Sequence, residues 1–218
     1  MVAIALSSAR EEVLARVRRA VATVPAAERP DDVPVPRGYL EREPEATLDR
    51  FVERVAEYRA GVRVVPSGDV ADAVAAVCRS HGVRRVVVPV DVPAEWLPKD
   101  VEPVADANLS ADELDAVDAV LTGCALAIAE TGTLVLDAGP RQGRRALTLV
   151  PDVHVCIVDA EQVVDGVPAA FRRLADGLRT TRRPLTLVSG PSATSDIELS
   201  RVEGVHGPRR LEVVVVRS

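Results

Sequence analysis

The sequence is poor in aromatic residues, in lysine and in cysteine, and each shortage excludes a class of chemistry. Aromatic residues make up 2% of the 218 residues, so the core must be built from aliphatic side chains. Lys99 is the one lysine and lies in a predicted loop, which leaves a Schiff-base mechanism a single poorly placed candidate. Cys78, Cys124 and Cys156 are far apart and form no C-x-x-C pair. An iron–sulfur cluster or a structural zinc site is therefore not expected.

Long apolar runs and an excess of positive charge are also missing. No run approaches the roughly 20 apolar residues of a membrane helix, and the apolar opening at 1–6 is too short for a secretory leader. The formal net charge of −6 argues against general nucleic-acid binding. Neither a phosphate-binding G-x-x-x-x-G-K-[ST] motif nor a dinucleotide G-x-G-x-x-G motif occurs. We expect a soluble cytoplasmic protein that binds no nucleic acid.

What is present is an aliphatic-rich chain whose pattern alternates from residue 61 onward. Short aliphatic runs predict strands at 62–65, 84–88, 116–121, 126–129, 133–136, 153–158, 185–188 and 211–216. Amphipathic spacing predicts helices at 69–80, 141–149 and 168–178, and Gly82 is predicted to end the first of them. A capping-box pattern from Ser110 to Glu113 predicts the start of a short helix. Buried strands that alternate with helices predict a three-layer α/β/α fold with a mostly parallel sheet. Antiparallel pairing is expected where no helix intervenes, between 126–129 and 133–136.

The amino-terminal part has a different character. Aliphatic residues at helical spacing predict amphipathic helices over 8–23 and 45–59, and the proline-rich stretch between them lacks periodicity. We therefore divide the chain into a helix and proline-rich arm, residues 1–44, and an α/β domain, residues 45–218. The apolar sides of the two helices suggest that this region docks a partner or makes a homo-oligomer.

The first candidate site follows the predicted strand at 126–129. It contains Glu130, Thr131, Gly132 and Thr133. Gly132 permits a positive φ and a close approach of a ligand, and the two hydroxyls could bind an oxyanion. Glu130 could act as a base or as a carboxylate nucleophile. The alternative is a tight turn between two strands, in which Glu130 only caps backbone amides.

The second candidate site follows the predicted strand at 185–188. Its polar residues are Ser189, Gly190, Ser192, Thr194, Asp196 and Glu198. In open α/β sheets, ligands bind beyond the carboxyl ends of strands. If Ser195 caps a helix with Glu198 as its partner, the first amides of that helix could bind an anion. If the segment is extended, alternate hydroxyl and carboxylate side chains share one face. A capped loop without a ligand is the third alternative.

Histidines and arginines supply further candidates. His206, between Gly204 and Gly207, could carry a proton or donate to an anion, or it could be a hydrogen-bonded turn residue. His154 is predicted to be a satisfied core residue, and His81 to lie at a helix carboxyl end. A basic cluster could receive a carboxylate or phosphate, or it could be a solvated helix face; it consists of Arg141, Arg144 and Arg145.

Four motifs occur together along the chain. They are A-E-T-G-T at 129–133, L-V-P-D-V-H-V at 149–155, S-G-P-S-A-T-S-D-I-E at 189–198 and G-V-H-G-P at 204–208. In this order the motifs resemble the LUD-domain family, and within it the C component of lactate-utilisation systems (the LutC/YkgG type). The resemblance covers the chain from about residue 45 to its end. Its most specific part is the pairing of the last two motifs.

The resemblance implies a fold similar to that of the sugar-phosphate isomerases, CoA transferases and folate cyclo-ligases (the NagB/RpiA/CoA-transferase-like group). It also implies a part in the oxidation of L-lactate to pyruvate, together with A-type and B-type partner proteins that carry iron–sulfur clusters. This chain lacks the cysteines for such clusters, so the cofactors belong to the partners. Its own ligand is expected to be a small carboxylate or another small anion.

Three roles remain open. The first, which we favour, is a subunit or accessory of a lactate-oxidising complex. The second is a separate enzyme acting on an acyl or phosphorylated molecule, because the triplet at Glu130 is loosely similar to the nucleophile motif of CoA transferases. The third is a module that senses a metabolite.

For the favoured role we predict that the candidate residues converge on one cleft. The candidates for catalysis are Glu130, Asp196 and His206. The candidates for ligand binding are Thr131, Gly132, Thr133, Ser189, Gly190, Ser192, Thr194, Glu198 and Gly207. No metal site is predicted, although Asp196 and Glu198 could take up Mg²⁺.

Overall fold

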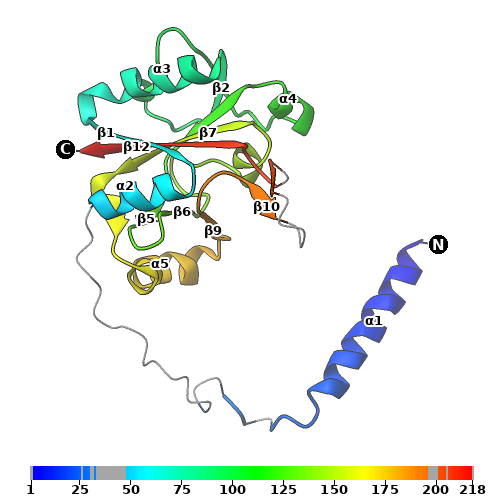
Figure 1. Ribbon diagram of the computed structural model, residues 1–218. Helices are drawn as coiled ribbons and strands as arrows, with labels where there is room; N and C mark the ends of the chain where they lie inside the picture. The colour runs from blue at the N-terminus through cyan, green and yellow to red at the C-terminus, as the bar shows by residue number, and fades with distance from the viewer. Residues whose placement is uncertain are drawn as a thin grey trace. The chain divides into compact units, whose positions relative to one another are not determined.

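A computed structural model describes residues 2–25, 27–29, 32, 48–195, 201–204 and 206–217. The chain forms two compact units, Met1–Glu41 and Arg42–Ser218 (Figure 1). The smaller unit contains helix α1 (Val2–Ala20), which begins earlier than the predicted 8–23 because the residues before Ser7 include no helix breaker. Val13 and Val17 on α1 are more than half exposed. The proline-rich arm beyond residue 32 lies outside the described residues. No described helix combines the length and the apolarity that crossing a membrane requires.

The larger unit is built on a six-stranded sheet in the order β1-β12-β7-β4-β2-β3. Its strands are β1 (Gly61–Pro66), β2 (Arg85–Val88), β3 (Glu102–Ala105), β4 (Ala119–Thr122), β7 (Val153–Asp159) and β12 (Arg210–Arg217). All five pairings are parallel. The central strands β4, β7 and β12 are buried on both faces, which explains their continuous aliphatic runs. The predicted mostly parallel sheet is confirmed.

A second sheet of four short strands has the order β8-β5-β6-β9. These strands are β5 (Leu126–Ile128), β6 (Thr133–Leu136), β8 (Val163–Val164) and β9 (Thr186–Val188). β6 is antiparallel to both β5 and β9, so the expected antiparallel pairing of the first two segments is confirmed. It follows that β5 and β9 run in the same direction and that their carboxyl ends lie at one edge.

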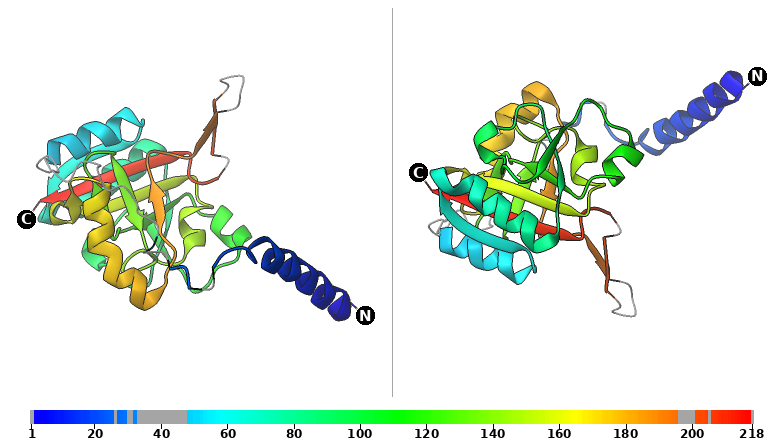
Figure 2. Two further views of the ribbon diagram at one scale, coloured as in Figure 1. Left: turned by 90° about the horizontal axis from the view of Figure 1, so that it is seen from below. Right: turned by 90° about the horizontal axis from the view of Figure 1, so that it is seen from above.

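Helices complete the layers, as Figures 1 and 2 show. Helix α3 (Val70–His81) covers one face of the large sheet, while α2 (Leu48–Glu57) and the small sheet cover the other. Helix α5 (Val167–Thr181) packs on the outer face of the small sheet. Phe51 of α2 is fully buried between these layers. The predicted three-layer α/β/α fold is confirmed, with a second sheet inside one of the outer layers.

Two predicted helix boundaries are confirmed by their caps. α3 ends at Gly82, whose φ of 67° and backbone contacts close the helix. Helix α4 (Ala111–Asp115) begins with the predicted capping box, in which Ser110 and Glu113 bond each other's backbone N–H groups.

The predicted helix over 141–149 is wrong, because only a 3-10 turn forms, at Arg145–Thr148. The chain before it adopts positive φ angles, 62° at Arg141 and 65° at Gly143. A right-handed helix cannot pass through two left-handed residues. The aliphatic spacing of this stretch therefore reflects packing of a loop.

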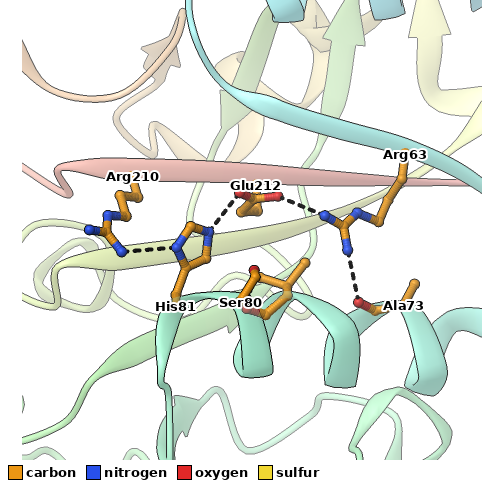
Figure 3. A network of polar contacts seen from close by, with 7 residues as sticks. Arg63, Ala73, Ser80, His81, Arg210 and Glu212 are labelled. Carbon is orange, nitrogen blue, oxygen red and sulfur yellow. Dashed lines mark hydrogen bonds and ion pairs between the residues drawn. The ribbon is translucent and has the colours of Figure 1, made fainter.

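A polar network fastens the carboxyl end of α3 to β12 (Figure 3). Arg210 donates to His81 Nδ1 over 2.9 Å, and His81 Nε2 donates to Glu212 Oε1 over 2.8 Å. Arg63 Nη2 donates to Glu212 Oε2 over 3.4 Å. A Cβ at Gly61 would lie 2.2 Å from the same carboxylate, so the glycine provides its space. His81 therefore links α3 to β12, and it lies at the carboxyl end of the helix, where it was expected.

Candidate functional site

A chain of hydroxyl groups joins the two motif loops at the edge where β5 and β9 end. Thr133 Oγ1 lies 2.7 Å from Thr131 Oγ1 and 2.7 Å from Ser189 Oγ. Thr133 is 4% exposed, whereas Ser189 is exposed to solvent. The structure thus places the predicted segments at 130–133 and 189–192 in direct contact.

The two candidate glycines in these loops make room for helix α2. A Cβ at Gly132, where φ is 59°, would lie 2.7–2.8 Å from backbone atoms of Arg54 and Val55. A Cβ at Gly190, where φ is 79°, would lie 2.8 Å from the carbonyl oxygen of Tyr58. Both positions require glycine for conformation and for space. The close approach expected for a ligand is made by the protein's own backbone.

Glu130 contacts the segment before α5 and not the hydroxyl chain. Its N–H donates to the carbonyl of Asp165 over 2.9 Å. Its Oε2 sits 2.8 Å from the position that a Cβ on Gly166 would take, directly before α5. A carboxylate there interacts favourably with the helix dipole. The Glu130 carboxylate therefore lies beside the amino end of α5, a position that the sequence analysis did not predict.

A cavity of about 260 Å³ is lined by half of the candidates that the structure describes. Ser189, Gly190, Ser192, His206 and Gly207 line it. Ser192 ties the two loops together, because its Oγ accepts from the His206 N–H over 3.0 Å and its own N–H donates to the Pro208 carbonyl over 2.9 Å. We refer to this space as the first cavity. Thr131 and Thr133 are linked to the first cavity through the hydroxyl of Ser189, but neither they nor Gly132 line it.

Sequence reasoning missed Thr148 and His154 as site candidates, and it considered Arg145, which also lines the first cavity, only as one member of the basic cluster. Arg145 Nη1 donates to Thr148 Oγ1 over 2.7 Å, and no carboxylate of the described residues forms an ion pair with Arg145. Partial burial lowers the pKa of Arg145, but a guanidinium remains charged at neutral pH. The sequence signal for Arg145 was its place in the basic cluster.

His154 forms part of the buried floor of the first cavity. It is 2% exposed, and its Nε2 lies 2.8 Å from Thr122 Oγ1. The hydrogen bond fits the satisfied core histidine that was predicted, and the cavity adds a face that the prediction left out. His154 lies within the motif at 149–155, which is the signal that could have identified it.

The basic cluster separates in space. Arg144 donates to both Asp106 oxygens, over 2.8 and 2.9 Å, and these hydrogen bonds hold the pKa of Asp106 below its ordinary value. Arg141 stacks over Trp96, with 5.4 Å between the guanidinium carbon and the ring centroid. Of the three arginines, Arg145 alone lines the first cavity.

The carboxylates at the end of the second motif are not placed. Asp196 and Glu198 lie outside the described residues. Thr194 lies in β10 (Ala193–Ser195), which pairs antiparallel with β11 (Arg201–Glu203). The segment is therefore extended up to Ser195, and the residues that a cap at Ser195 would begin lie outside the described residues. Within the described part of the chain, no group of three or more His, Cys, Asp or Glu residues could hold a metal ion.

The first cavity lies between the two sheets. Its polar rim comes from the carboxyl end of β9, as expected for a ligand site. Its floor includes His154 and Leu211, near the amino ends of β7 and β12. Relative to the large sheet, the first cavity thus lies at the amino ends of the strands, whereas a ligand site was expected at their carboxyl ends. The cavity combines a guanidinium that pairs with no carboxylate of the described residues, serine hydroxyls and an imidazole, which together can bind a small anion such as a carboxylate.

Comparisons with known proteins agree with this architecture. The LUD domain family model matches residues 48–216. A "Lactate utilization protein C" from Deinococcus radiodurans is 46% identical over 212 residues, 96% of either chain. One with the same name from Anoxybacillus flavithermus is 28% identical and covers 69% of this chain and 71% of its own. A crystal structure of a DUF162 family protein from Deinococcus radiodurans superposes with a TM-score of 0.68 and 43% identity, covering 78% of this chain and 95% of that one.

Proposed function

Because the chain belongs to the LUD-domain family, we propose that it serves in lactate utilisation as the cluster-free component of a system that oxidises L-lactate to pyruvate. In this reaction L-lactate loses two electrons and two protons. The electrons pass to iron–sulfur clusters carried by A-type and B-type partner proteins. The part of this chain is to bind the carboxylate substrate or product within the complex.

The observation that supports the proposal is Arg145 in the first cavity, which forms no ion pair with a carboxylate of the described residues. L-Lactate and pyruvate share a carboxylate, and a guanidinium can hold a carboxylate through two parallel hydrogen bonds. Thr148 orients Arg145 through its hydroxyl. Ser189 and Ser192 offer hydroxyls to the second oxygen function, and His206 stands at the exposed side of the cavity as a proton carrier.

Growth on L-lactate tests the proposal. A strain that lacks the gene is complemented with wild type, with Arg145→Gln or with Arg179→Gln. The last variant is the matched control, because Arg179 lies on α5, its side chain is 79% exposed, and its ion-pair partner among the described residues is Asp176 on the same helix. We expect wild type and the control to restore growth and Arg145→Gln to fail while accumulating to the same level. Growth restored by all three would remove the first cavity from the proposal, and unimpaired growth of the deletion strain would overturn the lactate role.

Binding by the purified protein separates a subunit from a sensor. We expect calorimetric titration to show that wild type binds L-lactate or pyruvate and that Arg145→Gln binds neither. Binding by wild type combined with normal growth of the Arg145→Gln strain would favour the sensing role instead. The separate-enzyme alternative depends on Glu130 as a nucleophile, and its position beside Gly166, away from the first cavity, lends that alternative no support.

A further inference from the structure

A second cavity, of about 330 Å³, lies between the carboxyl-terminal half of α5 and the carboxyl end of β4. Cys124 and Gln162 belong to its wall on the side of the large sheet. It shares no lining residue with the first cavity. The volume is within the range of small-molecule sites, and the position is the one at which open α/β sheets bind ligands.

One wall of the second cavity is a strained and firmly held turn. Arg141 and Ala138 both have positive φ angles, 62° and 52°, although neither is glycine. The N–H of Arg141 donates to Asp91 Oδ2 over 2.7 Å, and its carbonyl accepts from the Gly123 N–H over 2.8 Å. Its guanidinium rests on the ring of Trp96. Backbone strain that is held by several contacts marks functional positions, and here the contacts position an arginine.

The charge of the second cavity is opposite to that of the whole chain. Three arginines line it, Arg141, Arg173 and Arg183, in a protein whose net charge is −6. No carboxylate among the described residues forms an ion pair with any of them. Asp137 is a lining carboxylate whose Oδ1 accepts from the Gly139 N–H over 2.9 Å and from Gln142 Nε2 over 2.8 Å, and its one negative charge is outnumbered by the three arginines. The positive charge of the cavity is therefore available to a ligand.

Beside the polar Gln142, Gln162 and Thr181, the remaining lining includes an apolar surface. Leu174 and Leu178 of α5 face the cavity, with Leu185 beyond the helix. A ligand that uses both kinds of surface must combine concentrated negative charge with an organic body. Guanidinium groups match the geometry of phosphate oxygens, and several of them favour a dianion over a monocarboxylate such as lactate.

We propose that the second cavity binds a phosphorylated small molecule, with its phosphate held by Arg141, Arg173 and Arg183 and its organic part against Leu174, Leu178 and Leu185. This site is separate from the carboxylate site of the proposed function. It gives the chain a second ligand, which binds while the first cavity is free or occupied.

Trp96 provides a direct measurement, because it is the only tryptophan and it stacks against Arg141. The purified full-length protein is titrated with phenyl phosphate at constant ionic strength while tryptophan fluorescence and the melting temperature are followed. We expect a saturable fluorescence change and a rise in melting temperature. Inorganic phosphate should bind more weakly because it lacks the organic part, and benzoate should have no comparable effect because it carries a single charge.

Variants assign the response to the second cavity. Arg173→Gln and Arg183→Gln should each weaken phenyl phosphate binding at least tenfold, as expected for loss of one charge-assisted contact. Arg183→Lys should restore part of the affinity. Arg145→Gln, in the first cavity, should bind as wild type does. Circular dichroism and the melting temperature of the free variants establish that each is folded; both substituted side chains are exposed, so folding should be unaffected.

Several outcomes would overturn the proposal. The first is no saturable change up to about 10 mM phenyl phosphate, an affinity too weak for a built site. The second is an equal response to benzoate, which would indicate unspecific anion binding. The third is unchanged affinity in the Arg173→Gln and Arg183→Gln variants, and the fourth is loss of binding in Arg145→Gln alone, which would place the ligand in the first cavity.

Discussion

The hydroxyl of Thr133 lies 2.7 Å from the hydroxyl of Ser189, although 56 residues separate them in the chain. The register of the small sheet produces this contact. Leu134 of β6 pairs with Val188 of β9 in antiparallel fashion, so the preceding and following residues meet at the next position. Two motifs that resemble unconnected loops in the sequence are therefore one structural unit at the rim of the first cavity.

Removing the Thr133 hydroxyl should destabilise the protein more than removing that of Ser189. Thr133→Val leaves a nearly buried position without two hydrogen bonds and should lower the free energy of unfolding by about 1–2 kcal/mol. Ser189→Ala should cost about 0.5 kcal/mol, because an exposed hydroxyl exchanges its partner for water. Urea unfolding of both single variants and the double variant measures this. Full additivity would show that the two hydroxyls do not interact.

Two glycine substitutions should have opposite effects. Gly132→Ala places a Cβ against the backbone of α2 at a positive φ, and it should cost more than about 2 kcal/mol of stability. Gly177→Ala is the matched control, because it lies within α5 and no atom comes within 4 Å of its added Cβ. It should stabilise the protein by about 0.5–1 kcal/mol. Thermal and urea unfolding compare the two, and a tolerated Gly132→Ala would contradict the packing of this turn on α2.

The elements of the fold and its layers could be predicted from the sequence, whereas the order of the strands could not. Aliphatic runs located β7 and β12, and Gly82 and the capping box at Ser110 located helix ends, because these signals are local. The order of the strands could not be predicted, because an aliphatic run does not show with which other strand it pairs. β12, the last strand, lies between β1 and β7. The division of the short strands between two sheets was hidden for the same reason.

The loop residues of the first cavity could be predicted from the sequence, but the residues of its floor could not. Ser189, Ser192 and His206 stood out as polar residues beside glycines at strand ends. His154 did not, because a histidine inside an aliphatic strand has the same pattern whether its ring meets the core or a cavity. Arg145 was obscured by its two arginine neighbours, since the sequence does not tell which side chain turns to Asp106, to Trp96 or to the first cavity.

The network at the end of α3 should depend on the Glu212 carboxylate. Its side chain is 11% exposed and accepts from His81 and Arg63, so Glu212→Ala leaves both donors without this partner. We expect a loss of about 2–4 kcal/mol in the free energy of unfolding, and a smaller loss for Glu212→Gln, which keeps an acceptor for His81. Glu102→Gln is the control, because Glu102 is 67% exposed and 3.8 Å from Arg85. That change should have little effect. Equal losses in Glu212→Ala and Glu102→Gln would refute the role of the network.

Asp106 should contribute stability that disappears in acid. Arg144 holds the pKa of Asp106 below its ordinary value, about 3.9 in the unfolded chain. A depressed folded-state pKa means that the contribution is complete above the unfolded pKa and is lost as the pH falls through the folded pKa. Asp106→Asn should therefore cost about 2 kcal/mol near pH 7, and the difference from wild type should shrink below about pH 4.

Urea unfolding at several pH values measures this difference. Asp115→Asn, on the exposed side of α4, is the control and should differ from wild type by a small amount that does not vary with pH. A pH-independent deficit in Asp106→Asn would show that its carboxylate makes no charge-dependent contact with Arg144.

The three cysteines should resist thiol reagents in the native protein for different reasons. Cys78 is 1% exposed, and burial raises its pKa to about 11, so it is protonated at pH 8. Cys124 lines the second cavity, but its hydrogen bond with Cys156 and its burial raise its pKa well above the ordinary value. The same contact lowers the pKa of Cys156, which is 0% exposed.

Thiolates react and thiols do not, so a cysteine must be both ionised and reachable to be labelled. The thiol at the cavity wall, Cys124, has a raised pKa that disfavours its thiolate, while Cys156, whose pKa is lowered, is enclosed. Ellman's reagent at pH 8 should therefore release no rapid colour from the folded protein and three equivalents after unfolding in guanidinium chloride. One equivalent released within the mixing time by the folded protein would mean that the second cavity opens to the sheet behind Cys124. The second cavity, which Arg141, Arg173 and Arg183 line, would then extend deeper than the structure shows.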